Sequence, residues 1–289
     1  MRSQQAQMAE LVTSFFSRHL ASEFNASSHT ISSYRDTFRL LLLHVAKTTE
    51  RRIEHLALHD LTPKVILGFL DHLERDRGNS IATRNNRLSA VHSFFSYVLT
   101  QDPACAALSH RILAIPFKKA PRRLLGYLTD EEIRAILAVP NRTTINGRRD
   151  YLALGLLYDT GARVQELLDL CAADFRLDRL PLVHITGKGR KKRIVPLLPA
   201  TARLVGSYLA EIRRAPSDTT PLLRNYRGEQ MTRAGITFLI DKYRRIAVAT
   251  LPALGRKGIS PHSFRHSKAM HMLQAGVSLV TIKDILGHS

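Results

Sequence analysis

The stretch "TGARVQELLDL" places an arginine where it could hold a phosphate group. Arg163 follows a Thr-Gly pair at the expected start of a helix, and Glu166 lies three residues on, on the same helical face. A carboxylate behind a guanidinium fixes the direction of its N–H fork, and such forks bind phosphate through two hydrogen bonds. The pattern indicates Arg163 as an anion-binding residue supported by Glu166. The alternative is an ordinary ion pair within a helix.

A second stretch, "ITGKGRKKRIVPL", concentrates positive charge at a turn. Five of the seven residues from Gly187 to Arg193 are basic, and strand-like residues at 183–186 and 193–197 flank them. The pattern predicts a β-hairpin whose tip could enter a DNA groove, with Lys188 close enough to reach a strand. A plain charged turn is the alternative. The other basic residues that we expect to contact DNA here are Arg190, Lys191 and Lys192.

Two further stretches carry histidines. In "SPHSFRHS", His262 and Arg265 are three residues apart near an expected helix start, so both side chains would project together beside free backbone N–H groups. That combination is a potential anion site. The last stretch, "LGHS", follows a helical pattern and contains His288. A histidine at this place means little by itself.

The charge balance indicates a polyanionic partner. The chain has 289 residues with 43 Lys and Arg against 24 Asp and Glu, a formal net charge of +19. Nucleic acid is the first candidate for such a partner and an anionic membrane surface is the second. No apolar run approaches a membrane span, and the N-terminus has no apolar core of the signal-peptide kind. We therefore expect a cytoplasmic, nucleoid-associated protein that does not enter a membrane.

Neither a metal site nor a disulfide is expected. Cys105 and Cys171 lie in apolar, helix-like surroundings without a CxxC partner, which is typical of reduced thiols. His266 and His271 could suggest zinc, but no HExxH pattern or third ligand accompanies them, so we expect both to pack or face solvent. No cofactor is predicted.

The first part of the chain reads as helices over 5–21, 28–47, 61–78 and 80–100, each with apolar residues at helical spacing. Thr62 should cap the third of these, with Pro63 at its first position. The polar face of the fourth is short and basic, which suits a helix against a phosphate backbone, although a solvated face is equally compatible. The residues of that face are Thr83, Arg84, Asn86 and Arg87.

A basic, proline-containing stretch separates this part from the rest. "IPFKKAPRRLLGYLT" reads as an extended linker that would lie along DNA, and "TDEE" at 129–132 is a capping-box pattern that opens a new helix. We therefore expect a helical domain over 1–115, a linker over 116–128 and a second domain over 129–289. The linker residues expected to contact DNA are Lys118, Lys119, Arg122 and Arg123.

The second part is mixed. Beyond the hairpin, helices are expected over 148–170 with a break at the Thr-Gly turn, and over 199–214, 232–249, 260–276 and 278–287. The fold class is therefore mainly α with a small antiparallel β-sheet.

Taken in this order, the four motifs resemble those of the tyrosine recombinase (phage integrase) family. The helical stretches at 28–47 and 80–100 are also similar to the DNA-clamping domain of Xer and transposon-borne members. The resemblance implies a C-shaped clamp of two domains, a core DNA-binding (SAM-like) domain and a catalytic domain. It also implies double-stranded DNA with inverted-repeat half-sites as substrate, a homodimer on each site and a tetramer on synapsis.

The resemblance implies a mechanism as well. A tyrosine attacks the scissile phosphodiester and forms a 3′-phosphotyrosine while a 5′-hydroxyl leaves, so the bond energy is kept without ATP. Arg163 and Arg265 would clamp the non-bridging oxygens, and Lys188 would protonate the leaving oxygen. His262 and His288 would bond the phosphate or assist proton transfer.

The nucleophile is missing from the expected position. In the family the tyrosine follows the "LGH" motif by roughly nine residues, whereas the last of the eight tyrosines here is Tyr243. We therefore expect a chain truncated before its nucleophile, one that binds DNA without cleaving it. The alternatives are a non-catalytic DNA-binding protein on the recombinase fold and, less well matched by the helical first domain, a type IB topoisomerase.

Overall fold

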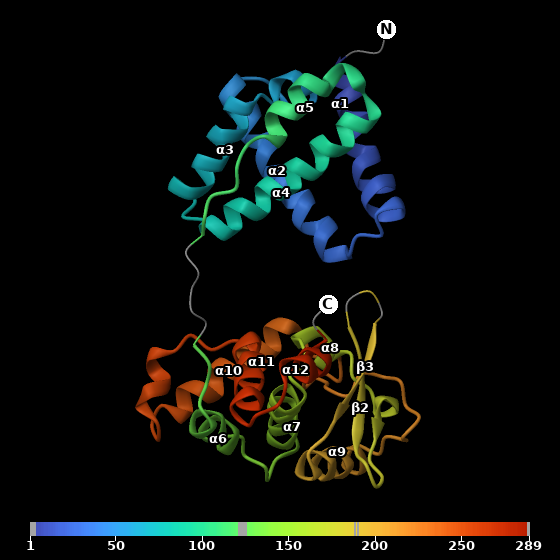
Figure 1. Ribbon diagram of the computed structural model, residues 1–289, viewed down its shortest axis with the longest axis vertical. Coiled ribbons are helices and arrows are strands. Elements are labelled where there is room, and N and C mark those ends of the chain that lie inside the picture. Colours follow the sequence, from blue (N-terminus) through green and yellow to red (C-terminus); the bar gives the residue numbers. More distant parts are fainter. Residues whose placement is uncertain (1–3, 121–125, 188, 190, 288–289) are drawn as a thin grey trace. The chain divides into compact units, whose positions relative to one another are not determined.

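The computed structural model describes residues 4–120, 126–187, 189 and 191–287. The chain divides into two compact units, Met1–Arg122 and Arg123–Ser289, each with its own hydrophobic core (Figure 1). The predicted fold class is confirmed, because the chain is mainly helical and its strands form one small antiparallel sheet. None of the helices in the described part of the chain combines the length and apolar character needed to span a bilayer.

The first unit is helical throughout. Phe15, Phe38 and Phe94 meet at its centre, with the rings of Phe15 and Phe94 5.3 Å apart and edge to face. Thr62 caps α3 as predicted, since its side chain accepts from the backbone N–H of Val65. The expected helix over 5–21 is an α-helix that continues as a π-helix. The helices are α1 (Gln4–Ser14), the π-helix (Phe15–Glu23), α2 (Ser28–Thr49), α3 (Pro63–Arg75), α4 (Ile81–Gln101) and α5 (Ala106–Leu113).

The second unit packs helices around a three-stranded sheet of order β1-β2-β3. In Figure 1, α7 and α11 lie between the sheet and α10. The helices are α6 (Asp130–Ala138), α7 (Ile145–Thr160), α8 (Val164–Leu168), α9 (Pro199–Glu211), α10 (Arg233–Ala247), α11 (Pro261–Gln274) and α12 (Leu279–Leu286). The strands are β1 (Phe175–Arg176), β2 (Leu182–Thr186) and β3 (Lys192–Pro196). Short 3₁₀ turns lie at Ile53–His55, Leu58–Asp60, Pro103–Cys105, Ala172–Asp174 and Pro252–Arg256.

The hairpin pairing sets which side chains face the core. Val183 and Val195 are cross-strand partners, and both are buried. Because successive strand residues alternate in direction, Ile185 and its partner Arg193 point to the same side as this pair. The hairpin therefore directs one arginine toward the helices of the second unit.

A glycine turn joins α7 to α8 and brings α12 close. Gly161 has a left-handed backbone, with φ of 58°, which favours glycine. A Cβ added there would lie 2.5 Å from a side-chain carbon of Leu286, so the turn also needs glycine for space. The start of α8 and the end of α12 therefore meet at this turn.

Candidate active site

Arg163 stands at the N-cap of α8, directly after the glycine turn. Its backbone N–H donates to Glu166 Oε2 at 2.8 Å, and its guanidinium Nη1 donates to Oε1 of the same carboxylate at 2.8 Å. The predicted contact between the two residues is therefore present. The Arg163 side chain is 37% exposed, so it can still meet a ligand from solvent.

Glu166 is buried and binds a second arginine. Its Oε2 accepts from Arg193 Nη2 at 2.7 Å, in addition to the bonds from Arg163. Burial acts to raise the pKa of this carboxyl, but the hydrogen bonds from Arg193 and Arg163 outweigh it and the pKa is lowered. Glu166 is therefore a carboxylate near neutral pH, and it holds two guanidinium groups at once.

Arg265 lies on α11 and is 6% exposed. Its Nη1 donates to the carbonyl oxygen of Gly161 at 2.6 Å, and its Nη2 donates to that of Leu286 at 2.5 Å. Burial first, and then the charge of Arg163, lower its pKa to about 10. His262 is exposed and stands one turn earlier on the same helix. Both residues therefore lie in the first turns of α11, but the His262 side chain faces solvent whereas the Arg265 side chain is buried. Their joint binding of an anion stays a prediction.

Three guanidinium groups donate hydrogen bonds to the C-terminus of α12. The last carbonyls of a helix have no partner within it and carry partial negative charge, so cations are stabilised there. Three successive carbonyl oxygens each accept from a different arginine. The pairs are Ile285 with Arg193 Nε at 2.9 Å, Leu286 with Arg265 Nη2 at 2.5 Å, and Gly287 with Arg163 Nη2 at 3.2 Å. The site is thus built from α8, β3, α11 and α12.

Some predicted residues fall outside the described part of the chain. They are Lys188, Arg190 and His288 in the catalytic unit, and Arg122 and Arg123 in the linker. Lys191 and Lys192 are described, and both are exposed on the hairpin. The backbone N–H of Gly187 donates to the carbonyl of Lys191 at 2.8 Å, which holds the two sides of the hairpin together.

The predicted basic face of α4 is partly engaged within the protein. Arg84 is 3% exposed, lies 3.4 Å from Glu74 and donates to the carbonyl of Pro116. Its burial argues against a DNA contact and gives it a packing role, because it ties α4 to the chain that follows α5. Arg87 is half-buried and donates to Ser33 and Thr37 on α2. Asn86 is exposed and Thr83 is half-buried.

The beginning of the linker is tied to the first unit. Asn85 donates to the carbonyl of Lys118 at 2.7 Å and accepts from its N–H at 3.2 Å. The Lys118 ammonium pairs with Glu74 at 2.8 Å, whereas Lys119 is exposed. The sequence pattern predicted an extended linker, and residues 116–118 are neither helix nor strand. Their contacts with Glu74 of α3 and Asn85 of α4, which the pattern did not predict, dock this part of the linker on the first unit.

Two residues that connect elements of the structure were not predicted from the sequence. Asn85 docks the linker, and Arg193 links Glu166 to α12. Arg193 did leave a signal, because a charged residue occupies an inward position of a strand whose next inward residue is Val195. Asn85 left none, since its partners are backbone groups far away in sequence.

Both cysteines and His271 pack within the protein. Cys105 and Cys171 are free thiols, and burial raises the pKa of each to about 11. His271 packs against the rings of Tyr127 and Tyr158 and lies 3.2 Å from Asp130. Within the described residues, no group of three or more His, Cys, Asp or Glu side chains could hold a metal ion.

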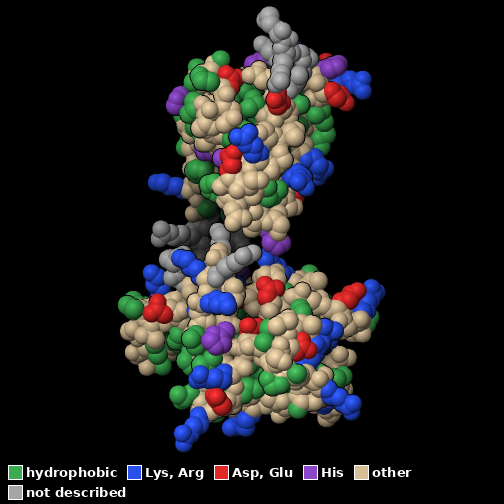
Figure 2. All heavy atoms as spheres, turned by 90° about the vertical axis from the view of Figure 1, so that its right-hand side faces the viewer, with side chains coloured by type: hydrophobic (Ala, Val, Ile, Leu, Met, Phe, Trp, Pro, Cys, Tyr) green, Lys and Arg blue, Asp and Glu red, His purple; other side chains and the backbone are tan. Residues whose placement is uncertain are grey.

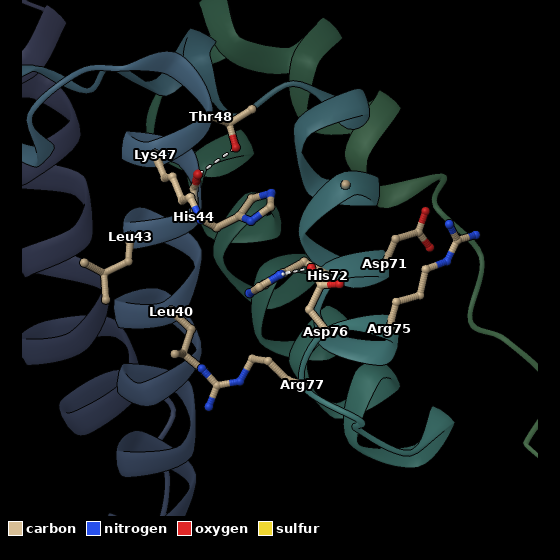
Figure 3. A pocket seen from close by; sticks show the side chains of 11 residues that line it. Leu40, Leu43, His44, Lys47, Thr48, Asp71, His72, Arg75, Asp76 and Arg77 are labelled. Atoms are coloured by element: carbon tan, nitrogen blue, oxygen red, sulfur yellow. Dashed lines mark hydrogen bonds and ion pairs between the residues drawn. The ribbon is translucent and has the colours of Figure 1, made fainter.

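A pocket of about 660 Å³ opens between α2 and α3 in the first unit (Figure 3). The rings of His44 and His72 stack across it with centroids 5.2 Å apart, and His72 Nδ1 lies 2.6 Å from Asp76. Burial first, and then the charges of His72 and Lys47, lower the pKa of His44. The pocket wall thus mixes both charge signs.

Basic side chains are spread over the surface. On the face in Figure 2, Lys and Arg side chains occur on both units, with Asp and Glu among them. The excess of positive charge is therefore not confined to the arginine cluster.

The second unit therefore combines two largely buried arginines, Arg193 and Arg265, and the partly exposed Arg163 with a basic hairpin on a mainly helical fold. Comparison with known proteins specifies the class of protein. The model of the phage integrase family matches residues 126–289, and that of the N-terminal SAM-like domain of phage integrases matches residues 14–102. The chain belongs to this family, the tyrosine recombinases, and is therefore a site-specific recombinase or integrase by class.

Relatives with curated names agree with this assignment. The chain is 39% identical to "Putative integrase/recombinase y4rC" of Sinorhizobium fredii over 98% of its own length and 85% of that protein. It is 34% identical to tyrosine recombinase XerC of Roseiflexus castenholzii over 98% and 86% of the two chains. Among solved structures, XerH bound to its difH substrate superposes with a TM-score of 0.69 at 25% identity, over 92% and 75% of the two chains.

Proposed function

We propose that the arginine cluster is the phosphate-binding centre of the strand-cleavage reaction. Arg163 and Arg265 would clamp the non-bridging oxygens of the scissile phosphate, and Glu166 would hold Arg163 in place. His262 and His288 would bond the phosphate or assist proton transfer. The observation that carries the proposal is the convergence of Arg163 and Arg265 on adjacent carbonyls, those of Gly287 and Leu286. Two guanidinium groups held this close form a charged cradle for one phosphate.

In the proposed reaction a tyrosine oxygen attacks the phosphorus atom and forms the 3′-phosphotyrosyl bond. The bond from phosphorus to the 5′-oxygen breaks, and Lys188 donates the proton that makes the leaving group a 5′-hydroxyl. In the second step, a 5′-hydroxyl of the partner strand attacks the phosphotyrosine. A new phosphodiester forms, the bond from phosphorus to the tyrosine oxygen breaks, and the enzyme is released. The exposed hairpin residues Lys191 and Lys192 would hold the DNA backbone nearby.

The eight tyrosines in residues 1–289 all precede the "LGH" motif, whereas the family has its nucleophile after it, and three of them can be judged from their surroundings. Tyr243 is buried, donates to Asp150 at 2.6 Å, and has a pKa raised by burial and by that carboxylate. Burial also raises the pKa of Tyr158 to about 12. Tyr226 is exposed, but it lies on a turn in contact with Arg227 and far in sequence from each of the four motifs. We propose that residues 1–289 bind DNA without cutting it and that the nucleophile is supplied from outside them.

The family supports a proposal for the substrate and the assembly. XerH is a relative whose structure holds its difH substrate in a pre-cleavage complex. We propose double-stranded DNA with inverted-repeat half-sites for this protein, with a homodimer on each site and a tetramer on synapsis. The core-binding domain would comprise residues 1–115 and the catalytic domain residues 129–289. Basic residues of the linker (Lys118, Lys119, Arg122, Arg123) and polar or basic residues of α4 (Thr83, Asn86, Arg87) would lie against the DNA backbone.

The experiment has two steps. Residues 1–289 are first used to select a bound DNA site from a library of random duplexes, and cleavage of the selected site by the protein translated to its stop codon is then assayed. Arg163→Ala and Arg265→Ala should each lower the cleavage rate by about 100-fold or more while the DNA dissociation constant changes little. Arg179→Ala is the control, because Arg179 is exposed at the turn between β1 and β2, away from the hairpin tip. Full cleavage by either cluster variant would overturn the assignment.

A further inference from the structure

Arg193 occupies a place where the fold would otherwise bury an apolar residue. It is the cross-strand partner of Ile185, next to the buried pair Val183 and Val195 on the same face of the sheet. Its side chain is only 10% exposed. A guanidinium group loses hydration on burial, so it is stable there only if partners in the protein replace the water.

Those partners come from two elements. Nη2 donates to Glu166 Oε2 at 2.7 Å, and Nε donates to the carbonyl of Ile285 at 2.9 Å. Two glycines make room for this arrangement. A Cβ at Gly287 would lie 3.0 Å from Arg193 Cδ, and a Cβ at Gly187 would lie 3.1 Å from Glu166 Oε1. The guanidinium therefore fills a tightly fitted space between β3, α8 and α12.

Glu166 connects Arg193 to Arg163, because its carboxylate accepts hydrogen bonds from both guanidinium groups. One oxygen of the carboxylate receives Arg193, and the other receives the guanidinium of Arg163 at 2.8 Å. Arg163 also reaches the carbonyl of Gly287, two residues from the carbonyl that Arg193 holds. Arg163 is thus supported at two points, Glu166 and the end of α12, and Arg193 contacts both supports.

We propose that Arg193 is a positioning residue for DNA strand cleavage, one that fixes Glu166 and the α12 terminus so that the Arg163 guanidinium is oriented before DNA binds. The inference rests on the proposed function of the arginine cluster. Without Arg193, Glu166 could rotate away from Arg163 toward solvent, and the end of α12 would lose one of its three arginine partners. Arg163 would then meet the phosphate from a wider range of directions, which slows the chemical step more than it weakens binding.

The test is a double-mutant cycle in the protein translated to its stop codon. Arg193→Met removes the charge and the hydrogen bonds, whereas Arg193→Lys keeps the charge and can make only part of the hydrogen bonds. Each is combined with Arg163→Lys, and the rate of covalent adduct formation in a single turnover is measured beside DNA affinity and melting temperature. Arg176→Met is the control, an arginine of the same sheet whose side chain is 53% exposed.

We expect Arg193→Met to slow adduct formation by at least about ten-fold, with DNA affinity within about two-fold of wild type and an intermediate rate for Arg193→Lys. In the Arg163→Lys background the same change should slow the reaction by less than about three-fold, because the residues act through one another. If Arg193→Met fails to fold, the Arg193→Lys arm of the cycle carries the comparison.

Independent, multiplying effects of the Arg163 and Arg193 substitutions would overturn the inference and leave the proposed function intact. Equal slowing by Arg193→Lys and Arg193→Met, with matching losses in melting temperature, would also overturn it, since that result describes a purely structural role. A wild-type protein that forms no adduct on its selected site would overturn the proposed function and, with it, this inference.

Discussion

Glu166 is the residue on which the arginine cluster depends. It is 6% exposed and accepts hydrogen bonds from both Arg163 and Arg193. Removing one partner of a buried ion pair is costly because the remaining charge stays buried without compensation.

Glu166→Gln should therefore lower the free energy of unfolding by about 3 kcal/mol at neutral pH, measured by urea denaturation. The folded-state pKa of Glu166 lies below its ordinary value of 4.5, so its contribution is present above that pH and is lost as the pH falls through the folded pKa. The gap between wild type and variant should shrink below about pH 4.5. Glu131→Gln, on an exposed residue, is the control. A gap that grows in acid would contradict this account.

The exposed lysines of the hairpin make a separate prediction. Replacing Lys191 and Lys192 by Ala should weaken DNA binding for all sequences alike. It should also reduce the slope of log K against log salt by about 0.9 for each phosphate that the protein no longer neutralises. Fluorescence anisotropy over a salt series measures both quantities. The charge-matched control is Arg176→Ala with Arg179→Ala, and an equal change in that variant would show that the effect is only one of net charge.

At the scale of single residues, spacing alone was enough to predict the contact between Arg163 and Glu166, since three residues on a helix determine it. The burial of Arg84 was not predictable in this way. A polar face has the same pattern whether it meets solvent or the carbonyl of Pro116, and that carbonyl is 32 residues away. Arg193 did show a signal, a charged residue at an inward position of a strand, but its partners on α8 and α12 were not predictable from that pattern.

The capping motifs and the hairpin strands agreed best with the sequence, whereas several helix ends differ from prediction by two or three residues. The capping box at Thr129 is present, with Thr129 Oγ1 accepting from the N–H of Glu132 at 3.2 Å and the Glu132 carboxylate accepting from the N–H of Thr129 at 2.8 Å. The two strands of the hairpin also agree with prediction to within one residue. By contrast β1, with two residues, is too short to show any alternation. Its existence follows from pairing with β2, which is a tertiary property.

Thr129→Ala should remove one partner of that capping box and lower stability by about 1 kcal/mol, with a matching fall in melting temperature. The buried carboxylate of Glu132 would keep its 2.7 Å pair with Lys257, so the loss should not exceed the cap itself. Thr219→Ala, at an exposed position outside a helix, serves as control. No change in the melting temperature of the Thr129 variant would contradict the assigned cap.

The packing of α2 against α3 should be sensitive to acid. His44 faces His72 and Asp76 on α3 and Lys47 on its own helix, and its pKa is lowered from an ordinary value of 6.5. A histidine of this kind contributes stability above its unfolded pKa, and that contribution is lost as the pH falls from 6.5 through the folded pKa. The melting temperature should therefore drop over this range, and the drop should be smaller in His44→Gln. His110→Gln on α5 is the matched control. If the melting temperature of His44→Gln fell with pH as steeply as that of wild type, the assignment would be contradicted.

For the molecule as a whole, the net charge of +19 predicts strongly salt-dependent DNA binding. Non-specific affinity should fall steeply between low and moderate salt, and a flat response would argue against DNA as the partner.

The two compact units each have a core of their own, so we expect limited proteolysis to cut first between them. The expected clamp shape of the two units on DNA stays a prediction.

The family followed from four short motifs, and the mainly helical fold followed from the spacing of apolar residues. Of the arginine cluster, the sequence indicated Arg163 and Arg265 but not Arg193, and their roles in phosphate transfer stay a prediction. The target sequence did not follow, since base recognition depends on the poses of a few side chains on DNA.

The most direct test of the account is a covalent-adduct assay on the selected DNA site, nicked beside the scissile phosphate so that the cleaved end diffuses away. Residues 1–289 should shift this DNA in a native gel yet form no adduct that survives SDS, whereas the protein translated to its stop codon should form one. An SDS-stable adduct from residues 1–289 alone would contradict the claim that the nucleophile lies outside them, and no adduct from either protein would contradict the proposed chemistry of the arginine cluster.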